Sequence, residues 1–122
     1  MARRAVQLVV LLCVLVACSS AKRQDTLKTT LVAVNQARDV FIRIDATAQD
    51  LILDSSTTKE QFTERITVYR KVQRKLRDGF ELVYKAIATA AIVDDDASLA
   101  NMLAAFRELI TTFDKFQKDH GP

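Results

Sequence analysis

The segment TKEQFTERITVYRKVQRKLRDGFELVYKAIATAAIV, residues 58–93, has the clearest helical period in the chain. Its apolar side chains recur every three or four positions, at Phe62, Ile66, Tyr69, Val72, Leu76, Phe80, Val83, Ile87 and Ala90. This spacing places them on one face of an α-helix. The segment contains no proline, and its one glycine, Gly79, lies on the apolar face beside Phe80. We predict a helix over 58–93, in which Gly79 allows close packing of a neighbouring helix rather than acting as a hinge.

The flanking segments have the same period. Apolar side chains occur at positions 27, 31, 34, 37, 41, 44, 48 and 51 before this segment. After it come Leu99, Met102, Phe106, Leu109, Phe113 and Phe116, with Leu103 and Ile110 beside them. Two glycines and one proline in 122 residues argue against a turn-rich β protein. We therefore predict two further amphipathic helices, over 24–54 and 96–118.

Both connections contain residues that cap helices. Thr57 with Glu60, or Thr58 with Gln61, fits a capping box, in which a hydroxyl accepts from an early amide while the acid or amide reaches back.

The second connection is a run of three aspartates, 94–96. A calcium loop of the EF-hand type needs ligands at alternating positions, a central glycine and a distal glutamate, and this order is missing here. We expect Asp95 or Asp96 to cap the third helix, and we assign no metal site.

Three amphipathic helices joined by short turns predict an all-α fold, an antiparallel up-down-up three-helix bundle over 24–119. With turns near 56 and 95, position i of the first helix faces about 112 − i of the second, and position i of the second faces about 190 − i of the third. Lys118 then lies level with Val72. The third helix ends there, and the first two continue beyond it as a hairpin tip.

The expected tip contains several apolar side chains, and two helices bury only a narrow seam. Contiguous exposed apolar surface usually marks an interaction site. The candidate residues for partner binding or self-association are Leu51, Ile52, Phe62, Ile66 and Tyr69. The alternatives are a seam that closes on itself as a coiled-coil hairpin, and a third helix that tilts across it.

The second helix also contains a basic cluster, which comprises Arg70, Lys71, Arg74, Lys75 and Arg77. Arg70, Arg74 and Arg77 are candidates for contact with an anionic partner, such as a cell-wall polymer or a lipopolysaccharide phosphate. The pairing rule also places Asp39 and Asp45 within a turn of Arg74 and Arg70. Interhelix ion pairs or a plain solvated face therefore explain most of the cluster.

The beginning of the chain has the pattern of an export signal. Arg3 and Arg4 precede an apolar run over 5–17, which at about 13 residues is shorter than the roughly 20 that a membrane span needs. The run ends in Leu15-Val16-Ala17-Cys18, which resembles the lipobox of bacterial lipoproteins.

The resemblance implies a signal peptide over 1–17, fatty acylation of Cys18 and of the new amino terminus, and a lipidated tether over 18–23. Ser19, being other than Asp, implies an outer-membrane address facing the periplasm in a Gram-negative envelope, or otherwise an exported membrane surface. The alternative is an ordinary signal peptide cut after Ala21, which leaves no cysteine.

Removal of the predicted signal peptide lowers the net charge of the chain. Cleavage before Cys18 removes two of the 18 basic residues, leaving 16 against 15 acidic ones, so the formal net charge of +3 falls to about +1. We therefore expect no nucleic-acid partner.

No residue pattern indicates catalysis. There is no glycine-rich phosphate loop and no motif that joins a nucleophile to a base. His120 is expected to be a solvated residue at a helix end rather than a ligand or base. Phenylalanines 80, 106, 113 and 116 are expected to form core rather than a ligand site. We predict a non-enzyme without cofactors.

The body (33–109) resembles small helical lipoproteins of bacterial and phage genomes. The resemblance is carried by Ala37-Arg38-Asp39-Val40-Phe41 and by Tyr69-Arg70-Lys71-Val72-Gln73-Arg74. It implies no specific activity. The function expected is a lipid-anchored interaction or structural module of the cell envelope, and the alternative is a phage lysis lipoprotein resembling an outer-membrane spanin subunit.

Overall fold

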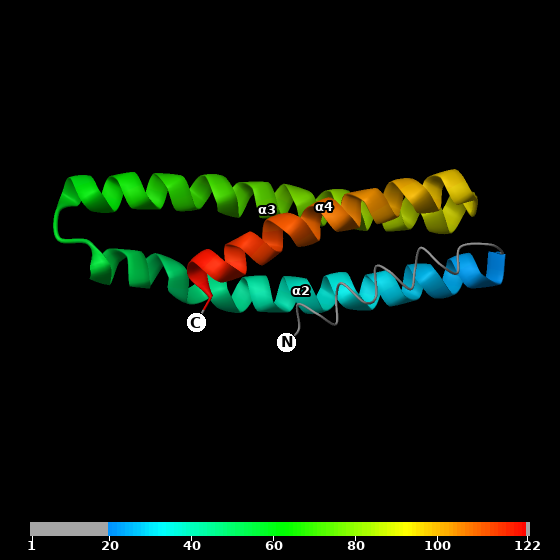
Figure 1. Ribbon diagram of the computed structural model, residues 1–122, viewed down its shortest axis with the longest axis horizontal. Helices are drawn as coiled ribbons and strands as arrows, with labels where there is room; N and C mark the ends of the chain where they lie inside the picture. Colours follow the sequence, from blue (N-terminus) through cyan, green and yellow to red (C-terminus); the bar gives the residue numbers. More distant parts are fainter. Residues whose placement is uncertain (1–19, 122) are drawn as a thin grey trace.

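The computed structural model describes residues 20–121, which form three helices (Figure 1). α2 spans Ser20–Ser55, α3 spans Lys59–Val93 and α4 spans Asp96–His120. Successive helices run antiparallel, and each packs against both others, most extensively α3 against α4. The predicted all-α, up-down-up three-helix bundle is confirmed.

The largest difference in helix bounds is at the start of α2. The expected tether over 18–23 is too long, because residues 20–23 already form the first turn of this helix. Two side chains of this turn are held by the α3–α4 connection: Ser20 and Arg23 both bind Asp94. These bonds fix the turn in helical conformation, a long-range effect that the local sequence does not reveal.

The α2–α3 connection uses the second of the two predicted capping boxes. The Thr58 hydroxyl accepts a hydrogen bond from the Gln61 N–H at 3.1 Å. The Gln61 side-chain oxygen returns to the Thr57 N–H at 2.7 Å, one residue earlier than in the ideal box.

The α3–α4 connection is set by two aspartates with different roles. Asp94 ends α3 in the left-handed conformation, with φ 53°, and its N–H donates to the Ala90 carbonyl at 3.0 Å. Asp95 caps α4, because its carboxylate accepts from the Ser98 N–H at 2.7 Å. The predicted capping role of Asp95 is confirmed.

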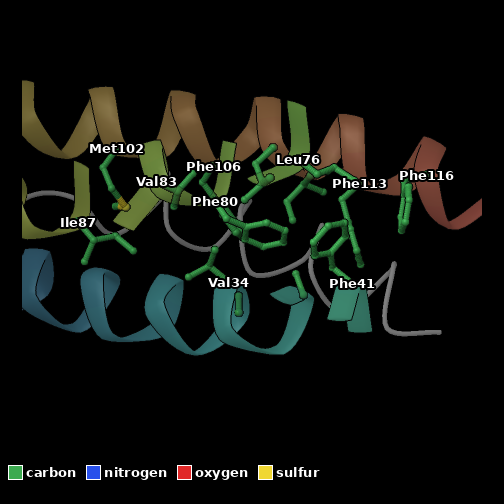
Figure 2. Packing of buried hydrophobic residues seen from close by; sticks show 14 of the residues in the cluster. Val34, Phe41, Leu76, Phe80, Val83, Ile87, Met102, Phe106, Phe113 and Phe116 are labelled. Carbon is green, nitrogen blue, oxygen red and sulfur yellow. The ribbon is translucent and has the colours of Figure 1, made fainter. Parts of the chain in front are cut away.

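Buried side chains from all three helices form one continuous core (Figure 2). At its centre the Phe41 ring lies 5.6 Å from that of Phe80 and 5.4 Å from that of Phe116. Phe113 contacts Phe80 edge-on at 6.3 Å. These rings, with Phe106, are all buried, as predicted for core residues.

The apolar face of α2 differs in detail from the prediction. Leu31 and Leu51 lie outside the core, while Thr26 and Thr30 lie within it. The buried threonines satisfy their hydroxyls on the carbonyl four residues earlier, at 2.9 Å for Thr26 and 2.8 Å for Thr30. A short polar side chain can thus occupy a helix–helix contact without an unsatisfied donor.

Gly79 lies where α3 and α4 approach closely. A Cβ atom at this position would stand 3.1 Å from the Leu109 Cδ1 atom, which is tighter than an ordinary van der Waals contact. The predicted role of Gly79 in close packing is confirmed.

α4 is shorter than its neighbours, so the two ends of the bundle differ (Figure 1). Its last residue, His120, packs edge-on against Tyr69 at 5.0 Å, which agrees with the predicted pairing of i with about 190 − i. Residues 46–68 extend beyond this level as a two-helix hairpin tip. The opposite end, the base, contains the start of α2 and the α3–α4 connection.

Candidate functional site

The hairpin tip exposes part of the apolar surface that the sequence predicts there. Leu51 is 59% exposed, whereas Ile52 and Phe62 are half-buried against the core. Ile66 and Tyr69 are buried, so they are corrected from candidate contact residues to core residues. Their side chains fill the α2–α3 seam, and the end of α4 reaches Tyr69.

Two further apolar residues contribute to the surface of the tip. Leu53 is 55% exposed and Val68 is 60% exposed. Val68 was not among the candidates, because it lies off the main apolar face of the segment. It nevertheless precedes Val72 and Leu76 at four-residue spacing, and both of these pack into the core. This spacing is the signal that identifies it.

A groove of about 500 Å³ begins where α4 ends. It lies over both helices of the hairpin and is lined by Ile52, Gln61, Glu64, Arg65, Val68, Tyr69 and His120. The groove has an apolar floor and a polar rim, and an inserted helix or side chain from a partner would continue the line of α4. His120 is therefore half-buried beside aromatic rings and not fully solvated, contrary to the prediction.

A polar network crosses the α2–α3 seam directly below the tip. The Asp45 carboxylate accepts from the Tyr69 hydroxyl and, at 2.7 Å, from the Gln73 side-chain amide. Its other oxygen lies 3.6 Å from Arg77. Burial, and then the hydrogen bond to Asp45, raise the pKa of the Tyr69 phenol well above its ordinary value of 10.0. The network links α2 to α3 at the level where α4 ends and only these two helices continue.

Only part of the basic cluster on α3 forms ion pairs. Arg77 pairs with Asp45, while Arg70 and Arg74 are exposed on α3 and make no ion pair within residues 20–121. The predicted pairing of Asp45 near Arg70 is wrong by about two helical turns, and Asp39 is exposed without an ion-pair partner in the same range. Arg70 and Arg74 remain available to an anionic partner as a prediction.

Arg77 also belongs to a second groove, of about 590 Å³, on the α2–α3 seam. The buried rings of Phe41 and Phe80 contribute to its lining. Arg38 lies over the Tyr84 ring at 5.9 Å, and the Tyr84 hydroxyl donates to Asn35 at 2.5 Å. The side chains that line this groove are thus held by contacts within the chain, and the packing of α2 against α3 explains the groove.

A second polar cluster lies at the base. The Asp94 carboxylate accepts from the Ser20 hydroxyl at 2.5 Å and from the Arg23 guanidinium at 3.1 Å. The same guanidinium binds Asp96 at 3.0 Å. The Ser20 hydrogen bond, followed by the Arg23 contact, lowers the pKa of Asp94 below its ordinary value. The cluster joins the start of α2 to the α3–α4 connection.

Residues 20–121 contain neither a metal-binding group nor a membrane-spanning helix. No three His, Cys, Asp or Glu side chains in this part of the chain are grouped so as to hold a metal ion. None of the described helices is long and apolar enough to cross a membrane. Cys18 and the signal segment over 1–17 lie outside the described residues.

Comparison with known proteins adds no assignment: no family model, no curated protein and no solved structure matches the chain.

Proposed function

We propose that the chain is a lipid-anchored cell-envelope protein that acts as a non-catalytic interaction module. Its hairpin tip would bind another envelope protein or a second copy of the chain. The observation that carries the proposal is a groove that α4 leaves uncovered, lined by the exposed Val68 and the half-buried Ile52. The exposed Leu51 and Leu53 flank Ile52 on α2.

The surface has the character of a protein-binding site. Exposed apolar side chains scattered singly are ordinary, whereas a group of them around a groove with a polar rim favours a partner. Leu51 and Leu53 lie near the end of α2, and Val68 lies on α3 next to Tyr69. An apolar helix seated in the groove would cover Ile52 and Val68 and leave the polar side chains of its lining in water.

The anchor gives the tip a direction. Cys18 precedes Ser20 by two residues, and Ser20 lies at the base, whereas the α2–α3 connection lies at the far end (Figure 1). The 36 residues of α2 span about 54 Å at 1.5 Å per residue. An acylated Cys18 would therefore hold the base at the membrane and present the tip roughly 50 Å away from it.

The tip is tested by in vivo cross-linking of the Leu51→Asp variant, with Leu82→Asp as its matched control. The two leucines are exposed to nearly the same extent, 59% and 57%, but Leu82 lies on α3 beside α4, away from the tip. We expect Leu51→Asp to lose the cross-linked product, and Leu82→Asp to retain it. Circular dichroism should show unchanged helicity in both.

Val68→Asp provides a second substitution on the other helix of the tip. A product of twice the chain mass identifies a second copy as the partner, and any other mass identifies a different protein. Wild-type cross-linking in both tip variants contradicts the proposed role of the tip. The anchor is tested separately by the mass of the mature protein, with and without inhibition of lipoprotein signal peptidase.

A further inference from the structure

The base of the bundle carries the most exposed large apolar side chain among the described residues. Ile92 is 84% exposed, and its neighbour Val93, the last residue of α3, is 51% exposed. Neither contributes to the core or to the grooves at the tip and seam. Two adjacent apolar residues at one end of a helical rod form a compact surface that differs in place and size from the tip.

The polar cluster at the base, formed by Ser20, Arg23, Asp94 and Asp96, holds this surface next to the start of α2. Asp94 follows Val93 directly and is bound by both Ser20 and Arg23, at 2.5 Å and 3.1 Å. The Arg23 bond to Asp96, at 3.0 Å, adds a second fixed point on the other side of the connection. The position of Ile92 and Val93 relative to Ser20 is thus set by three side-chain bonds.

Ser20 cannot be far from the lipid that the lipobox implies. Only Ser19 lies between it and Cys18, and the two residue steps of fully extended chain reach at most about 7 Å. The headgroup region of each leaflet is itself about 5–7 Å thick, so the base must stand at the membrane surface if Cys18 is acylated.

We propose that Ile92 and Val93, which project from the side of the last turn of α3, insert into the headgroup–acyl boundary of the bilayer that holds the Cys18 lipid, so that the bundle stands on the membrane inclined towards this face of α3. This inference rests on the anchor of the proposed function. It adds a second contact, made by the folded body itself, with lipid acyl chains as the partner.

The charges at the base limit the depth of the insertion. Arg23 binds the carboxylates of Asp94 and Asp96, and Asp95 accepts from the Ser98 N–H. Three carboxylates stand against two cations of the first α2 turn, Lys22 and Arg23, so this edge is slightly acidic, and charged groups are costly in the hydrocarbon core. The contact is therefore shallow.

A single tryptophan reports this contact, since the chain has none of its own. The Ile92→Trp variant, purified in its lipidated full-length form, is placed in phosphatidylcholine vesicles whose acyl chains carry bromine close to the headgroup. The control is Leu53→Trp, which places the same probe at a site 55% exposed in the hairpin tip. Circular dichroism establishes that both variants keep the helical fold.

We expect the emission of the tryptophan at position 92 to shift to the blue and to be quenched by the brominated lipid. The brominated lipid should leave the emission of the tryptophan at position 53 unquenched. Equal behaviour of the two probes overturns the inference: if both are quenched the rod lies flat on the membrane, and if neither is quenched the base does not touch lipid.

The mass of the same samples separates the two proposals. A lipidated protein with an unquenched probe at position 92 refutes docking of the base and leaves the anchor intact. A mature protein without lipid on Cys18 refutes the anchor, and the docking inference falls with it.

Discussion

Replacing Asp45 with alanine should destabilise the bundle strongly, because one carboxylate serves two buried donors. Tyr69 is 1% exposed and Gln73 is 9% exposed, and both donate to Asp45. A buried donor left without an acceptor costs about 1–3 kcal/mol. The pair with Arg77 adds little, because that side chain is 63% exposed.

The two donors together give a loss of about 2–6 kcal/mol, reduced somewhat because the Asp45 carboxylate no longer has to be desolvated. Domains of this size are typically stable by about 5–15 kcal/mol, so the change is large. Urea unfolding followed by circular dichroism measures it directly, with equal slopes confirming that the same surface unfolds.

Asp39→Ala is the matched control, because Asp39 lies on the same helix, is exposed and makes no ion pair within residues 20–121. We expect its stability to change by less than about 0.5 kcal/mol. The reasoning about buried donors is refuted if Asp45→Ala costs no more than Asp39→Ala.

Three further predictions concern single residues, each measured by urea unfolding. Because the pKa of Tyr69 is raised in the folded chain above its ordinary value of 10.0, stability should fall as pH rises above about 10, where the unfolded chain releases this proton first; Tyr69→Phe should flatten that fall. Gly79→Leu should cost about 1–3 kcal/mol by overpacking against Leu109, whereas Gly79→Ala should stay within about 1 kcal/mol because helix propensity offsets the contact. Asp95→Ala should cost about 1 kcal/mol through loss of the α4 cap, and an unchanged midpoint would contradict that role.

Local features of the fold were predictable from the sequence. The helices follow from apolar spacing, the Thr58 and Asp95 caps from short side chains just before apolar runs, and the role of Gly79 from its place on the apolar face. Each of these signals acts within a few residues of chain. The start of α2 was not predictable in this way, because it depends on contact with Asp94, which lies 74 positions beyond Ser20.

The register between α2 and α3 shows why contacts were harder to predict than helices. Counting from the turn places Asp45 level with Thr67, but its partners are Tyr69, Gln73 and Arg77. Side chains on a helix point towards its amino terminus. On these antiparallel helices the Asp45 side chain therefore points towards the base, and the α3 side chains point towards the tip. As a result, Asp45 meets α3 residues of higher number than the count predicts.

The location of the candidate site could be predicted from the sequence, but the residues that belong to it could not. The end of α4 followed from helix lengths, and with it the existence of a tip. Which apolar residues stay exposed depends on how α2 and α3 rotate about their axes, and this rotation places Tyr69 inside and Val68 outside. Apolar spacing alone does not fix that rotation.

The unequal helix lengths imply that amide hydrogen exchange is graded along the rod. Backbone amides near Phe41, Phe80 and Phe116 are enclosed by three helices, so they can exchange only through large-scale opening. Amides in 46–68 are covered by two helices and can exchange by fraying of the hairpin while the rest stays protected. The end that we propose as the partner-binding end is thus also the end that the chain can remodel at the lowest free-energy cost.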